Sequence, residues 1–294
     1  MNTPTLALDV GGTKLAAALV DTAGRVLRST RRRTPAVGVW DEVSAMLRDV
    51  RGSAPIRGIG ISCVGPIDLM AGTVSPVNIT EWMRFPLRDR VAALVGDLPV
   101  ALANDGVCMA LGEQRHGARG GSPYLFGVVV STGVGGGLVA GGRPVLGRSG
   151  NAGHVGHVVV EPGGDPCGCG GRGCLETVTS GPHLVRWARQ RGWAGDDAAA
   201  LATSARAGDA VARRAFRRGG LALGRALASV AAVCDVDLIV LGGGVAEAAE
   251  LLLDPTREAL AEHARLEFLR SARVVPASLG SAGGLVGAAA LLDA

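Results

Sequence analysis

Aromatic side chains are scarce in this sequence, at 3% of the residues. Proteins that bind nucleic acids usually stack bases on aromatic rings or present a clustered basic face. The formal net charge is only +4, and the short basic run at 31–33 is interpreted as a solvated strand end. We therefore expect no nucleic-acid partner.

Long apolar runs are also missing. No apolar stretch reaches the roughly 18–20 residues that span a membrane, and the first ten residues lack the basic segment and apolar run of a secretory signal. Hydrophobic residues make up 48% of the chain and charged residues 19%, which is typical of a globular protein. We expect a cytoplasmic protein without a membrane partner.

Strands and helices are predicted to alternate along the 294 residues, a length that favours two domains. Two similar strand–glycine turn–strand segments begin about 120 residues apart, at 6 and 126, and indicate two related α/β halves. Further strands are predicted at 56–65, 99–105, 236–244 and 272–280. Helices are predicted at 40–49, 87–95, 181–191, 209–233 and 257–265, and after Asp105.

Lysine is almost absent: of the thirty basic residues, only Lys14 is not arginine, and it lies in the glycine turn "DVGGTK". Glycine turns expose backbone N–H groups that bind phosphate oxygens. Thr13 adds a hydroxyl donor, and Asp9 is placed to hold Mg²⁺ through water. An ordinary hairpin turn explains the glycines equally simply.

Two more glycine turns come after predicted strands, at "STGVGGG" (131–137) and "LGGGVA" (241–246). Three such turns in one chain favour a nucleotide ligand. A P-loop is not supported, because Lys14 is not followed by a helix. The dinucleotide pattern at 135–140 is not supported either, since "GGRP" comes directly after it where a helix would be needed.

Asp105 follows Asn104 at the end of a predicted strand and begins a predicted helix. The helix dipole and free N–H groups stabilise a carboxylate there. Such a carboxylate accepts a proton from a sugar hydroxyl that attacks phosphorus. The alternative role for Asp105 is a plain helix cap.

Cysteine and histidine are few, yet three of six cysteines and two of five histidines lie within residues 153–176. Cys167, Cys169 and Cys174, with His157, complete a tetrahedral structural zinc site. Without a secretion signal, disulfides are the less expected use of these cysteines. Zinc would also fix the neighbouring His154 and Glu176 in position. Glu176 suits hydrogen bonds to a polyol, or simply starts a helix. The remaining cysteines, Cys63, Cys108 and Cys234, are predicted to be buried thiols.

Taken together, these motifs resemble those of the ROK family (repressor, open reading frame, kinase), and the His–Cys–Cys–Cys loop is the most specific of them. The resemblance implies a two-lobed, actin-like (ribonuclease H-like) α/β fold with duplicated domains around a cleft that holds ATP and sugar. The expected lobes are 1–113 with about 282–294, and 114–281. Members usually form homodimers or homotetramers.

The resemblance also implies a role for each matching residue. The phosphates of ATP would contact Asp9, Gly11, Gly12, Thr13, Lys14, Thr132 and Gly133, with Gly243 and Gly244 near the adenosine. The sugar would contact Asn78, Asn104, His154, His157 and Glu176, with Asp105 as the general base. Mg²⁺ would accompany ATP, and His157 would also bind zinc.

One departure from the family pattern concerns the sugar. Kinases of the family usually read A-G-E-x-G-H, whereas this chain reads "AGHVGH", so that His154 replaces the usual Glu. Bacterial N-acetylmannosamine kinases of the family are similar at this position. The resemblance thus favours phosphorylation of the 6-hydroxyl of N-acetylmannosamine, with glucose as the alternative substrate.

Two other functions belong to different classes. Transcriptional regulators of the family carry a helix-turn-helix before the first glycine turn, which here begins at Asp9 and is expected to leave no room for one. A sugar-binding protein without turnover is the other alternative, if His154 has ended catalysis.

Overall fold

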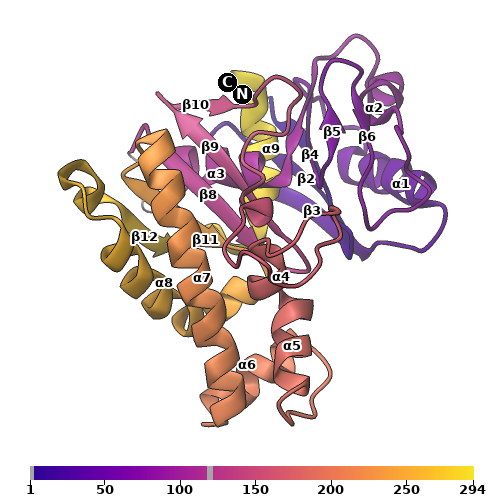
Figure 1. Ribbon diagram of the computed structural model, residues 1–294. Coiled ribbons are helices and arrows are strands. Elements are labelled where there is room, and N and C mark those ends of the chain that lie inside the picture. Colours follow the sequence, from indigo (N-terminus) through magenta and orange to yellow (C-terminus); the bar gives the residue numbers. More distant parts are fainter. Residues whose placement is uncertain (1–2, 118–121) are drawn as a thin grey trace. The chain divides into compact units, whose positions relative to one another are not determined.

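The computed structural model describes residues 3–117 and 122–294 (Figure 1). The chain divides into two compact units. The first comprises Met1–Pro123, Gly137–Gly153 and Ser281–Ala294, and the second comprises Tyr124–Gly136 and His154–Gly280. The first unit thus includes residues 114–123 and 137–153, which we expected in the larger lobe.

The first unit is built on a five-stranded sheet in the order β3-β2-β1-β4-β7. Its strands are β1 (Thr5–Val10), β2 (Lys14–Val20), β3 (Val26–Arg33), β4 (Ile59–Cys63) and β7 (Val100–Asn104). β1, β2 and β3 form antiparallel pairs, whereas β1, β4 and β7 run parallel. The carboxyl ends of these three parallel strands therefore share one edge of the sheet.

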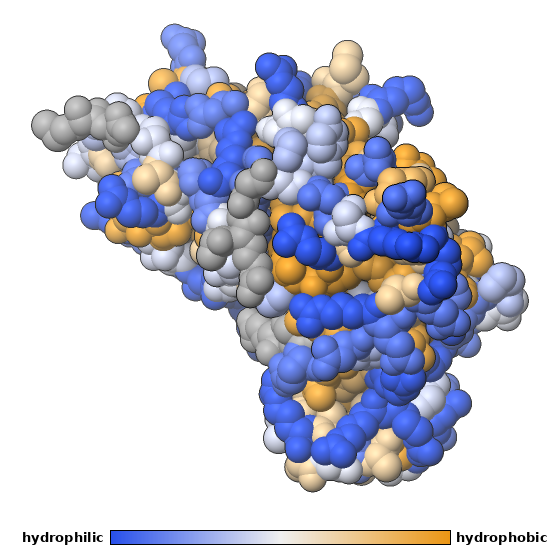
Figure 2. Space-filling model, turned by 90° about the vertical axis from the view of Figure 1, so that its left-hand side faces the viewer, coloured by the Kyte–Doolittle hydropathy of each residue, from blue (hydrophilic) through white to orange (hydrophobic). Residues whose placement is uncertain are grey.

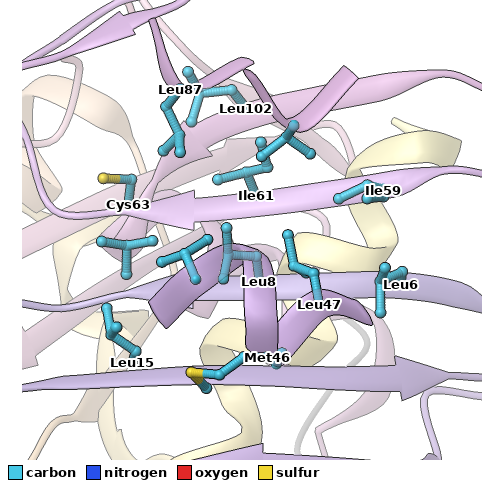
Figure 3. Close-up of a cluster of buried hydrophobic side chains, with 14 of the residues drawn as sticks. Leu6, Leu8, Leu15, Met46, Leu47, Ile59, Ile61, Cys63, Leu87 and Leu102 are labelled. Atoms are coloured by element: carbon cyan, nitrogen blue, oxygen red, sulfur yellow. The ribbon is translucent and has the colours of Figure 1, made fainter. Parts of the chain in front are cut away.

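Helices cover both faces of this sheet. They are α1 (Val39–Arg51), α2 (Leu87–Val95), α3 (Asp105–His116) and α9 (Gly283–Ala290). Because side chains alternate along a strand, Leu6 and Leu8 of β1 join the core that includes Met46 of α1 (Figure 3). Asp9 points to the opposite face, where α9 packs.

Close packing of α9 depends on glycine. A Cβ added at Gly60 of β4 would lie 1.7 Å from the Ala288 carbonyl oxygen, and one at Gly287 would lie 1.6 Å from the Cys108 carbonyl oxygen. The absence of these side chains lets α9 approach both the sheet and α3. The sequence pattern did not predict α9, because its short apolar run has no polar face.

The second five-stranded sheet has the order β10-β9-β8-β11-β12. Its strands are β8 (Leu125–Val130), β9 (Val134–Ala140), β10 (Arg143–Val145), β11 (Leu238–Gly242) and β12 (Arg273–Pro276). A short hairpin pairs β5 (Ile67–Asp68) with β6 (Thr73–Val74).

The strands predicted at 56–65, 99–105, 236–244 and 272–280 are confirmed as β4, β7, β11 and β12, each with shorter bounds.

The helices of the second unit are α4 (Glu176–Thr179), α5 (Gly181–Arg189), α6 (Ala198–Arg206), α7 (Ala210–Cys234) and α8 (Ala249–His263). Short 3₁₀ turns are η1 (Val155–His157), η2 (Val245–Ala248), η3 (Glu267–Ser271), η4 (Gly280–Ala282) and η5 (Leu291–Asp293). The predicted start of α8 at 257 is wrong, since the helix continues through Pro255. The ring of Pro255 fits against Gly220 of α7, where a Cβ would lie 2.6 Å from it.

Charged side chains join the outer parts of these helices. Both terminal guanidinium nitrogens of Arg217 in α7 donate to Glu258 of α8, at 2.6 and 2.8 Å. Figure 2 shows hydrophilic side chains interspersed with apolar ones on one face of the protein. Among the described residues, no helix has the length and apolar character to cross a membrane.

Candidate active site

The first glycine turn connects β1 and β2. The Gly11 N–H donates to the Lys14 carbonyl oxygen at 3.0 Å, and the Thr34 hydroxyl donates to the Gly11 carbonyl oxygen at 2.8 Å. Asn78 lies against this turn, because a Cβ added at Gly12 would be 2.7 Å from the Asn78 Cβ. Thr13 and Lys14 are exposed, which leaves their polar groups accessible to a ligand.

Asp9 precedes this turn and is held from two sides. The Ser62 hydroxyl of β4 donates to Asp9 Oδ1 at 2.6 Å. A Cβ at Gly284 of α9 would lie 3.1 Å from the carboxyl carbon of Asp9, so any side chain at this position would crowd the carboxylate. Burial raises the pKa of Asp9, while the Ser62 hydrogen bond and the charges of Lys14 and Arg31 lower it. The sequence reasoning missed Ser62, although it is the one hydroxyl in the otherwise apolar strand 59–63.

Asn104 and Asp105 lie where β7 ends and α3 begins. The Gly106 N–H donates to both side chains, to Asn104 Oδ1 at 3.0 Å and to Asp105 Oδ1 at 2.8 Å. Asn104 is thus the N-cap of α3. Burial, and next the negative charge of Asp9, raise the pKa of Asp105 from 3.8 to about 7, against the opposing Gly106 hydrogen bond. A carboxyl group with this pKa is suited to accept a proton near neutral pH.

The first unit therefore brings together one group of the predicted residues at one edge of its sheet. Asp9, Ser62 and Ala103 align across β1, β4 and β7, and Asp105 comes two residues after Ala103. In open α/β sheets, ligands bind outside the carboxyl ends of parallel strands. The members of this group are Asp9, Gly11, Gly12, Thr13, Lys14, Asn78, Asn104 and Asp105.

The second unit brings together the other glycine turns. The turn after β8 is closed by the Ser131 N–H, which donates to the Gly133 carbonyl oxygen at 2.9 Å. A Cβ at Gly244 would lie 3.6 Å from Ser131 Oγ, which places the turn after β11 beside this one. Gly243 has a φ of 99°, in the left-handed region, and a Cβ there would lie 2.4 Å from the Val130 carbonyl oxygen.

Glu176 contacts the same turn. Its Oε2 accepts a 2.9 Å hydrogen bond from the Val134 N–H, and it would lie 2.7 Å from a Cβ added at Gly133. Thr132 is exposed beside it. Thr132, Gly133, Gly243, Gly244 and Glu176 therefore form a second group of the predicted residues, within the second unit.

The predicted zinc ligands also gather in the second unit. The ligand atoms of His157, Cys167, Cys169 and Cys174 all lie within 4.8 Å of one another. The Sγ atoms of Cys169 and Cys174 are 3.7 Å apart, as are Cys167 Sγ and His157 Nδ1. A tetrahedral ion with Zn–S bonds of about 2.3 Å would separate two sulfur ligands by about 3.8 Å. The donor set and its spacing fit zinc.

His154 lies immediately before η1, the turn that contains His157. The two imidazole rings are 6.2 Å apart between centroids, with 23° between their planes. His154 is partly buried, whereas His157 is exposed. A metal ion bound by His157 would therefore fix the backbone that carries His154.

Comparison with models of protein families identifies the family of this chain. A model described as the ROK family matches residues 5–294. The chain belongs to the ROK family. The predictions of this family and of its actin-like α/β fold class are confirmed.

Relatives of this chain in the family include sugar kinases. A glucokinase from Streptomyces coelicolor is 33% identical over an alignment of 307 residues. This alignment covers 98% of this chain and 96% of the relative. An N-acetylmannosamine kinase from Escherichia coli is 36% identical over 246 residues, which cover 82% and 83%. The solved structure of a ROK family glucokinase from Streptomyces griseus, in complex with glucose and AMPPNP, has a TM-score of 0.86 with 37% identity and covers 98% of both chains. The predicted enzyme class, an ATP-dependent sugar kinase, is confirmed at this level.

Proposed function

We propose that this ROK family protein transfers a phosphoryl group from ATP to the 6-hydroxyl of a hexose or an N-acyl hexosamine, with N-acetylmannosamine as the preferred acceptor. The observation that carries the proposed reaction is the partly buried Asp105, whose pKa is raised to about 7 at the start of α3. A base with this pKa is largely ionised slightly above neutral pH and still binds a proton firmly.

Asp105 accepts the proton of the 6-hydroxyl as that oxygen attacks the γ-phosphorus. The new oxygen–phosphorus bond forms while the bond to the β-phosphate oxygen breaks, and ADP leaves. Asn78 and Asn104 of the first unit and His154, His157 and Glu176 of the second orient the sugar. The exposed Lys14 and Thr13, with the backbone of Gly11 and Gly12, contact the phosphates.

The second unit supplies the remaining nucleotide contacts. The turn of Thr132 and Gly133 contacts phosphate oxygens, and Gly243 and Gly244 lie near the adenosine. Asp9 would hold Mg²⁺ through water, and this ion supplies positive charge against the phosphates. A structural zinc ion on His157, Cys167, Cys169 and Cys174 would fix the loop that carries the sugar contacts. We further propose a homodimer or homotetramer, as the family resemblance implies.

The choice of N-acetylmannosamine depends on His154. A glutamate accepts hydrogen bonds from sugar hydroxyls, whereas an imidazole can also donate one and occupies more space. Such a side chain matches an acetamido group, which offers a carbonyl acceptor in place of a hydroxyl.

Glucose is the second candidate acceptor. The glucokinases are related to this chain at a similar level, 33% for the S. coelicolor relative and 37% for the S. griseus structure. Overall identity therefore favours neither sugar.

A coupled ADP-release assay with Mg-ATP tests the proposal. It compares N-acetylmannosamine, glucose, N-acetylglucosamine and mannose side by side. We expect N-acetylmannosamine to exceed the other sugars at least about tenfold in kcat/KM, which corresponds to about 1.4 kcal/mol of transition-state binding. A higher value for glucose would assign a glucokinase, and turnover of none of these sugars would contradict the kinase proposal.

A further inference from the structure

Glu176 contacts the turn of residues 131–134, which is the proposed phosphate contact of the second unit. Its Oε2 accepts the 2.9 Å hydrogen bond from the Val134 N–H, at the first residue of β9. Val134 is buried, so this N–H would lose an important partner if the carboxylate were removed. The carboxylate thus fixes the backbone at the point where the turn ends and the strand begins.

The other side of the same turn is held by the segment that Glu176 begins. The Gly181 N–H donates to the Ser131 carbonyl oxygen at 2.9 Å. Residues 176–181 therefore bind the turn 131–134 at both of its ends. A Cβ added at Gly133, between these two bonds, would lie 2.7 Å from Glu176 Oε2, so a side chain there would displace the carboxylate.

The same segment continues directly from the cysteine loop. The Thr177 N–H and hydroxyl both donate to the Cys174 carbonyl oxygen, at 3.0 and 2.7 Å. The Leu175 N–H donates to the Val158 carbonyl oxygen at 2.9 Å, next to His157. A continuous series of contacts thus joins the cysteine loop, Glu176 and the turn at Gly133.

We propose that Glu176 is a positioning residue for the nucleotide phosphates, in addition to its proposed contact with sugar. The carboxylate holds the turn of Thr132 and Gly133 in the shape that binds phosphate, so it contributes to nucleotide affinity before any sugar arrives. This inference rests on the proposed function for the identity of the turn's ligand. A residue that contacts only sugar would leave nucleotide affinity in the sugar-free protein unchanged.

Removal of the Glu176 carboxylate also has an opposing effect on nucleotide affinity, through its charge. The negative charge of Glu176 repels phosphate oxygens, and removal of that charge strengthens phosphate binding if repulsion outweighs positioning. The backbone donor occupied by the carboxylate would then be available to phosphate as well. The sign of the change in nucleotide affinity therefore separates the two effects.

The test is calorimetric titration of the full-length, sugar-free protein with the non-hydrolysable ATP analogue AMPPNP and Mg²⁺. We expect Glu176→Ala to raise the Kd about tenfold or more, the equivalent of one hydrogen bond to a charged group. Glu258→Ala is the matched control, because it removes a carboxylate of the same unit that binds Arg217 of α7 and lies outside the turn. We expect it to leave this Kd unchanged. An unchanged or lower Kd for Glu176→Ala would overturn the proposal.

A second pair of variants does not depend on removal of the carboxylate alone. Gly133→Ala pushes a methyl group against Glu176 Oε2, so we expect it to raise the AMPPNP Kd in the natural sequence. In the Glu176→Ala background this contact is absent, and the same substitution should have a smaller effect. Equal effects in both backgrounds would contradict the proposed coupling between Glu176 and the turn.

The two proposals fail in different ways. If the protein binds AMPPNP but phosphorylates no sugar, the proposed function fails while the Glu176 comparison still gives a result. If it phosphorylates sugar but Glu176→Ala changes only the KM for sugar, the positioning role alone is wrong. Melting temperature and zinc content of each variant show whether a change in Kd reflects loss of the fold.

Discussion

Ser62 and Asp9 lie directly opposite each other on the parallel strands β4 and β1, and the Ser62 hydroxyl donates a 2.6 Å hydrogen bond to Asp9 Oδ1. This bond leaves Oδ2 of Asp9 available to other partners. Ser62 itself is completely buried. Its role is therefore to hold the carboxylate in one orientation, next to the first glycine turn.

Substitution of Ser62 tests this role. We expect Ser62→Ala to lower kcat/KM about tenfold, because a buried carboxylate loses a hydrogen bond worth about 1.5 kcal/mol and gains freedom to rotate. The Mg²⁺ concentration that gives half-maximal rate should rise, since Asp9 is the proposed magnesium contact. Ser62→Thr retains the hydroxyl and should lose less activity. An unchanged magnesium dependence in Ser62→Ala would show that the bond does not position Asp9.

We expect Asp105, the proposed base, to set the pH dependence of the rate. Its pKa is raised to about 7 by burial and by the charge of Asp9, and only the ionised form can accept a proton. We expect kcat/KM to fall below about pH 7, tenfold for each further pH unit, and to reach a plateau above it. Asp105→Asn should abolish most of the activity at every pH. A natural-sequence profile that stays flat down to pH 5 would exclude Asp105 as the base.

The same carboxyl group makes stability depend on pH in the opposite direction. Because the folded pKa of about 7 exceeds the ordinary value of 3.8, the folded state binds the proton more tightly than the unfolded state. Stability from this group is therefore present at low pH and is lost as the pH rises from about 4 to 7. Asp105→Asn removes the buried charge, so we expect its Tm to exceed that of the natural sequence at pH 8.

Calorimetry of both proteins at pH 5 and pH 8 checks this. The difference in Tm between Asp105→Asn and the natural sequence should be larger at pH 8 than at pH 5. A difference of the same size at both values would mean that Asp105 titrates as an exposed carboxyl group does. In that case the ionised Asp105 would lower the stability of the folded state only slightly.

Much of the fold was predictable because its signals are local. Alternating apolar residues and glycine turns identified the strand that carries Asp9 and the strand that ends directly before Asp105, and the helix at 87–95 has the predicted bounds. The cysteine spacing indicated a cluster that the structure brings within 4.8 Å. In these cases the residues that form the feature lie close together in sequence.

The features that the sequence did not predict depend on contacts between distant segments. The bond from Ser62 to Asp9 crosses 53 positions. Gly284 approaches Asp9 from the far end of the chain, and α9 forms although its short apolar sequence carries no helical periodicity. Pro255 lies inside α8, and its ring packs where Gly220 of another helix leaves space for it. Single-sequence patterns contain no information on such pairs.

We expect removal of zinc to affect the second unit through the cysteine loop, which joins the zinc ligands to Glu176. The four predicted ligands lie in the segment 157–174, whose glycine-rich turns are closed by backbone hydrogen bonds such as the one from the Cys167 N–H to the Gly171 carbonyl oxygen at 2.9 Å. We expect the purified protein to contain about one zinc ion per chain, and Cys169→Ser, or treatment with a strong chelator, to release it and lower the Tm by several degrees. Cys234→Ser is the matched control, because Cys234 lies at the end of α7 outside the cluster, and it should retain the metal. Elemental analysis and calorimetry of the three proteins check this, and a natural protein without bound zinc whose Tm is insensitive to chelator would contradict the assignment.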